Sequence, residues 1–204
     1  MKRKIADIKK TFEENHDSKK IKIAKKSYPT KAKVIGVTVP NLRNVLKELK
    51  KQTKHYSNSE RLKLVKELNK TNIFECQQLA FKYIENDKGT LRELTEKDID
   101  ELGERIDNWV TADNYGALVV GYSWREGIIS TDKIKSYLKS DDFWIRRIAI
   151  VATVSLNQKA RGGKGDVKQT LEICELVVDD HQDMINKALS WALTQLASII
   201  SKQA

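Results

Sequence analysis

The sequence predicts an all-α protein of stacked helix pairs, and three observations support that fold class. Prolines and glycines, which interrupt helices, number only two and nine in 204 residues. Charged residues make up 32% of the chain, and the 40% of hydrophobic residues is enough for a sizeable core. Apolar side chains recur at helical spacing, whereas no segment shows the period of two that is typical of a strand.

Residues 1–33 are the most biased stretch, and we expect a basic helical segment there that ends in a loop. Seven lysines between positions 19 and 33 interrupt a few apolar residues around Tyr28-Pro29. Such a run is typical of a solvated helix face, and phosphate contact or a nuclear-import signal are the sharper alternatives.

From Pro40 onward the helical period continues along the chain. Pro40 suits the first turn of a helix over residues 40–51, and Ser57 or Ser59 could cap a second helix over residues 58–70. Further helices are predicted over residues 73–87, 96–110, 112–122, 131–140, 142–156, 167–180 and 181–202. Short joints and a core that is spread along the whole length favour a helical solenoid, with residues 1–204 forming a single domain.

The formal net charge of +10 and the pI near 9.4 would attract a polyanion, so nucleic acid leads the expected partners. The alternative is that the charge only keeps the protein in solution. Cys76 and Cys174 are far apart and only three histidines are present, which predicts core thiols in a reducing compartment and no metal site. No apolar run reaches the ~20 residues of a membrane span. We therefore expect a monomer, neither secreted nor membrane-bound, in the cytoplasm or in a eukaryotic nucleus.

Motifs of nucleotide hydrolysis, zinc peptidases and serine hydrolases are absent from the sequence. The segment KARGGKGD over residues 159–166 is the one flexible insertion. Its basic side chains among glycines could contact a phosphate, and a plain surface loop is the alternative.

Two residues near the middle of the chain form the first candidate site. Trp109 and Asp113 are four residues apart and share one helix face if the helix runs unbroken there. A carboxylate on an apolar stripe needs a partner or a hydrogen bond. Asp113 therefore either serves a site or is the N-cap of a helix NYGALVVG over residues 114–121.

The segment FWIRRIAI over residues 143–150 carries Trp144, Arg146 and Arg147. Consecutive residues of a helix point about 100° apart, so at least one arginine lies near the apolar stripe. A buried arginine needs a carboxylate or a phosphate, and Asp113 is the natural partner. The alternative is that both arginines lie on the surface.

The last predicted helix places a tryptophan beside its polar side. Its apolar stripe includes Ile185, Ala192 and Leu196, whereas Trp191 has Lys187 as a face neighbour. Trp191 could stack on a base or a sugar while Lys187 binds a phosphate, although tryptophans also occur at the margins of cores.

Four blocks of sequence resemble the bacterial DNA alkylation repair family of AlkD-like glycosylases. Their order and separation match that family from about residue 28 to residue 200. The blocks are VIGVTVPNLRNVLKELKK at 34–51, DNWVTAD at 107–113, FWIRRIAI at 143–150 and MINKALSWAL at 184–193.

The resemblance implies HEAT-like helical repeats with a concave basic face that holds double-stranded DNA. Active members of the family hydrolyse the N-glycosidic bond of cationic alkylated purines, with no metal or organic cofactor. By motif position, Trp109 and Asp113 resemble the catalytic pair, Arg147 its partner arginine, Trp191 the second aromatic that faces the lesion, and Tyr28 a family tyrosine. Trp144, Arg146 and Lys187 complete the candidate substrate-binding residues.

Two other functions stay open. Val110 stands where the family often has an acidic residue, Thr194-Gln195 where it has Arg-Glu, and Ala204 comes before the helices that usually close the C-terminal side. A noncatalytic relative that binds distorted or branched DNA would tolerate these differences. A helical scaffold for protein partners is the third possibility.

Overall fold

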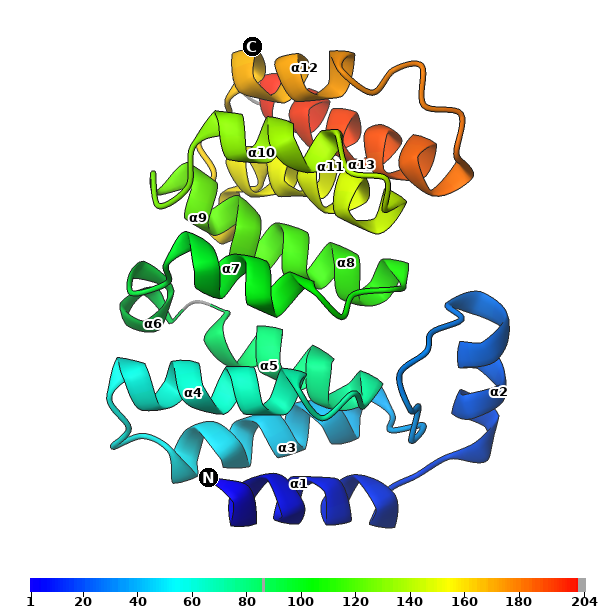
Figure 1. Cartoon of the computed structure of the whole chain (residues 1–204), viewed down its shortest axis with the longest axis vertical. Coiled ribbons are helices and arrows are strands. Elements are labelled where there is room, and N and C mark those ends of the chain that lie inside the picture. Colours follow the sequence, from blue (N-terminus) through cyan, green and yellow to red (C-terminus); the bar gives the residue numbers. More distant parts are fainter. Residues whose placement is uncertain (86, 202–204) are drawn as a thin grey trace. The chain divides into compact units, whose positions relative to one another are not determined.

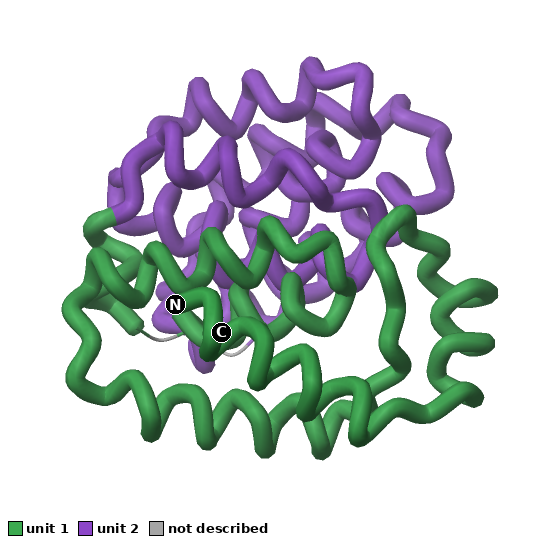
Figure 2. Tube along the Cα trace, turned by 60° about the horizontal axis from the view of Figure 1, so that its bottom comes forward, with its two compact units in different colours: residues 1–93 green, residues 94–204 purple. Residues whose placement is uncertain are grey.

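The structure is a computed structural model that describes residues 1–85 and 87–201. Within these residues every regular element is a helix, and β pairing is limited to two isolated bridges, His16 with Val37 and Lys33 with Ile73. The predicted all-α class is therefore confirmed. The chain forms two compact units, residues 1–93 and residues 94–204 (Figure 2). The single domain over residues 1–204 stays a prediction.

Unit 1, residues 1–93, contains the predicted helical hairpin. Pro40 lies in the first turn of α3, and Ser57 caps α4 through a capping box with Glu60. Helix α5 packs against both α3 and α4 and is almost wholly buried. The helices of this unit, which Figure 1 colours from blue to green, are α1 (Lys2–Glu14), α2 (Ser18–Ser27), α3 (Val39–Gln52), α4 (Asn58–Asn69), α5 (Phe74–Ile84) and α6 (Lys88–Arg92).

The N-terminal segment differs from the expectation of one basic helix followed by a loop. It contains two helices, because Asp17 accepts a hydrogen bond from the backbone N–H of Lys19 and so starts α2 after α1 has ended. Helix α1 buries Ile5, Ile8 and Phe12, whereas α2 buries only Ala24. The basic part of the segment is thus a separate helix with little buried surface.

Unit 2, residues 94–204, is built around α11. From Arg147 to Asn157 every residue of this helix is buried, and α8, η1, α9, α10, α12 and α13 all contact it. Its elements are α7 (Glu96–Gly103), α8 (Trp109–Tyr115), η1 (Gly116–Val120), α9 (Gly121–Arg125), α10 (Thr131–Leu138), α11 (Phe143–Asn157), η2 (Lys159–Arg161), α12 (Val167–Glu175) and α13 (Asp183–Ile200).

Helices α8, η1 and α9 follow one another without a break, so the boundary predicted between residues 110 and 112 was wrong. The middle part, η1, is a π-helix, whose hydrogen bonds span five residues. Gly116 and Gly121, five residues apart, both lie against α11: added Cβ atoms would come within 3.0 Å of the Ile148 carbonyl oxygen and 2.5 Å of the Ala152 carbonyl oxygen. The π turn thus lets two glycines face α11 at close range.

Both cysteines are buried free thiols, as predicted. In the part of the chain that the structure describes, no helix is long and apolar enough to cross a membrane.

Candidate active site

Helix α8 places the first two candidate residues. Asn108 is fully buried and its side chain accepts a hydrogen bond of 3.0 Å from the backbone N–H of Thr111, so the helix begins at Trp109. Asp113 follows one turn later on the same face, as the four-residue spacing predicted. The alternative that Asp113 is an N-cap is therefore wrong, because Asn108 has that role.

Arg147 is the partner of Asp113. Its Nε donates to Asp113 Oδ1 at 2.8 Å and its Nη2 to Asp113 Oδ2 at 2.9 Å, which is the two-pronged geometry that only a guanidinium provides. Its Nη1 donates to the backbone carbonyl of Met184. One guanidinium thereby joins α8, α11 and α13, and the predicted ion pair between Asp113 and Arg147 is confirmed.

This ion pair is shielded from solvent on one side only. The Arg147 side chain is 6% exposed, whereas the Asp113 side chain is 19% exposed. Burial raises the pKa of the Asp113 carboxyl above its usual value, and the hydrogen bonds and charge of Arg147 oppose that increase. The site therefore holds a carboxylate that is oriented by its partner and still reaches the surface.

Trp109 lies beside this carboxylate with 36% of its surface exposed. The ring face of a tryptophan attracts cations, and a carboxylate in a partly desolvated place attracts them more strongly. Together the two side chains can stabilise positive charge at the surface of α8.

The two neighbours of Arg147 on α11 differ from it in their surroundings. The ring of Trp144 is half-buried and lies 4.4 Å from that of Phe143, between ring centroids. Arg146 forms an ion pair of 2.9 Å with Asp180 and donates to the Ser140 carbonyl at 2.8 Å. Arg146 thus holds parts of unit 2 together, and its contact with substrate stays a prediction.

On α13, the stripe residues Ile185, Ala192 and Leu196 are buried, as predicted. Trp191 is half-buried, and it lies on the same helix and in the same unit as the Met184 carbonyl that Arg147 binds. Lys187 is exposed and forms an ion pair of 2.7 Å with Asp183. Their roles in binding substrate stay predictions.

Tyr28 lies in unit 1, at the end of α2. Its ring stacks on Phe74, with 5.0 Å between centroids and an interplanar angle of 21°. Burial, and to a smaller extent the charge of Glu75, raise the pKa of the Tyr28 phenol. This environment orders the ring, and its role in the reaction stays a prediction.

Glu75 in α5 is a buried carboxylate that the sequence patterns did not single out. It is 2% exposed and accepts hydrogen bonds from the backbone N–H groups of Ile35, Gly36 and Val37, at 3.0, 2.7 and 3.3 Å. A single charged residue inside the otherwise uncharged run IFECQQLAF was the available signal. Its partners lie about 40 positions earlier, so spacing within the helix could not identify them.

Among the described residues, no group of three or more histidine, cysteine, aspartate or glutamate side chains is placed to hold a metal ion.

The fold and the site define a class: an all-α protein of packed helix pairs, with an ion pair at a partly exposed face beside a tryptophan. Residues 8–202 match the family described as DNA alkylation repair enzyme, and the chain belongs to that family. No curated protein sequence matches the chain. Family membership confirms the expected HEAT-like helical fold class and implies a DNA substrate.

Proposed function

We propose that this protein is a DNA glycosylase that hydrolyses the N-glycosidic bond of cationic alkylated purines in double-stranded DNA. The observation that carries the proposal is the carboxylate of Asp113, which Arg147 holds by both oxygens beside the exposed ring of Trp109. Membership of the DNA alkylation repair family supports DNA as the substrate.

The chemistry fits the site because alkylation already activates the substrate. A purine that carries a positive charge is a good leaving group, so its departure needs no general acid. What the reaction needs is stabilisation of the positive charge that develops on the sugar, and a carboxylate can supply it. In this scheme Asp113 faces the sugar and positions water, and Trp109 lies against the cationic nucleotide.

Arg147 acts in the proposal as a positioning residue. Its two-pronged contact fixes the direction of both carboxylate oxygens and favours the ionised form of Asp113. The excess of positive charge on the whole chain, +10, would bring the protein to the DNA backbone.

The direct test measures the release of methylated purines from methylated duplex DNA. We expect the wild-type protein to release them and Asp113→Asn to be slower by at least about 100-fold, because the substitution removes the charge while nearly preserving shape. Asp132→Asn is the matched control, since Asp132 is an exposed acid at the start of α10 in the same unit.

Circular dichroism and DNA binding of each variant separate a loss of chemistry from a loss of fold. No release by the wild-type protein over a range of pH and salt would contradict the proposal. So would an Asp113→Asn variant that is folded and as active as the wild type.

One observation favours a second candidate, a noncatalytic protein that binds distorted or branched DNA. Both oxygens of Asp113 accept hydrogen bonds from Arg147, so the pair would be satisfied as a purely structural link between α8 and α11. Such a protein would bind DNA with an affinity that falls steeply as salt rises, and would release no base from methylated DNA. Binding that is absent or indifferent to salt would point instead to a protein scaffold.

A further inference from the structure

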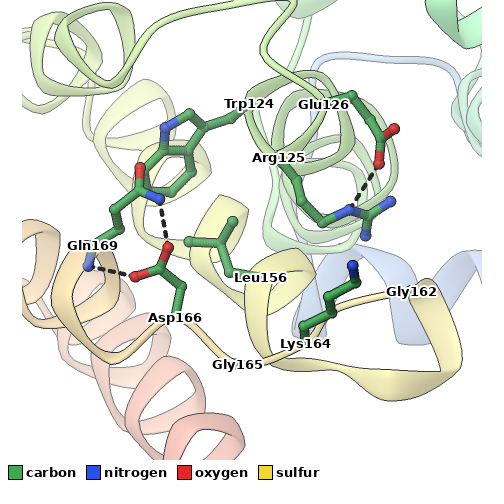
Figure 3. Close-up of a pocket in the computed structure, with 9 residues that line it drawn as sticks. All are labelled: Trp124, Arg125, Glu126, Leu156, Gly162, Lys164, Gly165, Asp166 and Gln169. Carbon is green, nitrogen blue, oxygen red and sulfur yellow. Dashed lines mark hydrogen bonds and ion pairs between the residues drawn. The ribbon is translucent and has the colours of Figure 1, made fainter.

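A pocket with a volume of about 280 Å³ lies in unit 2, next to the loop over residues 158–166 (Figure 3). It is a different place from the Asp113–Arg147 pair. Leu156, which lines the pocket, follows Arg147 by nine residues on α11, which corresponds to about 13 Å along the helix axis. The remaining lining residues are Trp124, Arg125, Glu126, Gly162, Lys164, Gly165, Asp166 and Gln169.

The backbone of this loop is fixed against α11, which makes one wall of the pocket rigid. Gly162 has a φ of +88°, a conformation that suits glycine, and Gly163 is so close to α11 that a Cβ there would lie 2.6 Å from the Leu156 carbonyl oxygen. The Gly163 N–H donates to the Gln158 carbonyl at 3.1 Å. The predicted insertion thus forms a tight glycine turn against α11.

Arg125 holds the loop from the other side. Its Nη1 donates to the Ser155 carbonyl at 3.2 Å and to the Arg161 carbonyl at 2.7 Å, and its Nε donates to Glu126 at 3.1 Å. No described residue accepts a hydrogen bond from its Nη2, which lies against Gly162. One edge of this guanidinium thus stays available to a ligand.

Lys164 supplies a second cation. Its side chain points toward Arg125 in the pocket (Figure 3), and within residues 1–85 and 87–201 it has no ion pair or hydrogen bond. Two like charges that point toward each other repel, and an oxyanion between them would remove that repulsion.

The two acids that line the pocket are already engaged. Glu126 accepts from Arg125, and Asp166 accepts from the backbone and side-chain nitrogens of Gln169, at 2.9 and 2.6 Å, as the N-cap of α12. Neither acid forms an ion pair with Lys164.

From this geometry we propose that the pocket binds a phosphate group, through Lys164 and the Nη2 of Arg125. The phosphate belongs either to a free nucleotide or to the DNA backbone. The proposal does not depend on the glycosylase reaction, because it uses none of the residues that face the ion pair of Asp113.

The test uses the full chain labelled with ¹⁵N and follows the amide signals of Gly162, Gly163 and Gly165 together with the indole N–H of Trp124. Inorganic phosphate and deoxyadenosine monophosphate are the small probes. We expect saturable shifts of these signals, and an affinity at least about tenfold weaker in Lys164→Ala, because a hydrogen bond to a charged group is lost.

Lys159→Ala is the matched control, since Lys159 is exposed in the same loop and does not line the pocket. Equal weakening by Lys159→Ala and Lys164→Ala would show a general effect of charge and overturn the proposal. The absence of saturable shifts with both small probes and with duplex DNA would overturn it as well.

An unmodified DNA duplex distinguishes the two sources of the phosphate. If DNA supplies it, the duplex shifts the same signals and Lys164→Ala lowers the salt dependence of DNA binding by about one unit in slope. If a nucleotide supplies it, deoxyadenosine monophosphate binds more tightly than inorganic phosphate and DNA binding is unchanged in the variant. Release of methylated purines is not a readout here, so this test and that of the glycosylase can fail separately.

Discussion

Glu75 in unit 1 and Asp113 in unit 2 are carboxylates with little exposed surface, and they differ in what holds them. In unit 1, Glu75 is 2% exposed and accepts three backbone N–H groups from residues 35–37. In unit 2, the Asp113 side chain is 19% exposed and accepts two N–H groups from a single side chain, Arg147. Glu75 thus stabilises a loop, whereas Asp113 is oriented by Arg147.

The hydrogen-bond partners indicate which of the two carboxylates has a structural role and which is a candidate for chemistry. The oxygens of Glu75 are buried and accept hydrogen bonds from backbone N–H groups, so this carboxylate stabilises the loop over residues 35–37. A guanidinium orients a carboxylate and leaves one side of it facing solvent, where Trp109 lies 36% exposed. Substitutions at Glu75 should therefore act on stability, and those around Asp113 on activity.

The largest effect that we expect is on stability, from Glu75→Ala. Two buried N–H groups and a third, partly buried one lose their acceptor. Each buried unsatisfied group costs about 1–3 kcal/mol, so the free energy of unfolding should fall by about 2–6 kcal/mol. Urea denaturation measures it. Glu14→Ala, at an exposed acid in the same unit, should change it by less than about 0.5 kcal/mol. If both variants changed the free energy of unfolding by a similar amount, Glu75 would not stabilise the loop as proposed.

The next effect is on activity and its pH dependence, from Arg147→Lys. Lysine keeps the charge but loses the two-pronged contact, so we expect purine release to fall by about 10- to 100-fold. The carboxylate must be ionised to act, and activity therefore falls as the pH drops through the pKa of Asp113. Burial already raises that pKa and Arg147 opposes the increase, so weaker hydrogen bonding moves the acid limb to higher pH.

The control for this prediction is Arg146→Lys, one residue earlier on α11. Arg146 pairs with Asp180 rather than with Asp113, so its replacement should leave the position of the acid limb unchanged, whatever it does to DNA affinity. If Arg147→Lys lowers the rate without moving the limb, Arg147 does not act through the ionisation of Asp113.

The difference between the two carboxylates also explains what the sequence could predict. Trp109 and Asp113 lie on one helix, so a spacing of four residues was enough to place them on one face. The arginine partner followed from the need of a buried guanidinium for a carboxylate, because only a few acids lie on apolar stripes. Periodicity alone could not decide between Arg146 and Arg147, which are neighbours and differ only in what packs against them.

The features that the sequence did not predict depend on contacts between segments that are distant in the chain. Nothing in the spacing around Glu75 points to residues 35–37, because they come from a loop about 40 positions away. The close approach of Gly116 and Gly121 to α11 at the π turn η1 is likewise a contact between segments that are distant in the sequence. By contrast, Asp17 was an available signal for the second N-terminal helix, since aspartate is a preferred N-cap.

The smallest effect extends the comparison to an exposed carboxylate, Asp183, whose partner is Lys187 on the next turn of α13. The two side chains are 72% and 60% exposed, so solvent screens their ion pair and neither Asp183→Ala nor Lys187→Ala should change the thermal midpoint measurably.

If Lys187 contacts a DNA phosphate, Lys187→Ala lowers DNA affinity by a few fold and reduces the salt slope by about one. Asp183→Ala frees the same lysine and should raise affinity. Fluorescence anisotropy titrations at several salt concentrations measure both changes, and affinities that move in the same direction in the two variants would remove Lys187 from the DNA-binding surface.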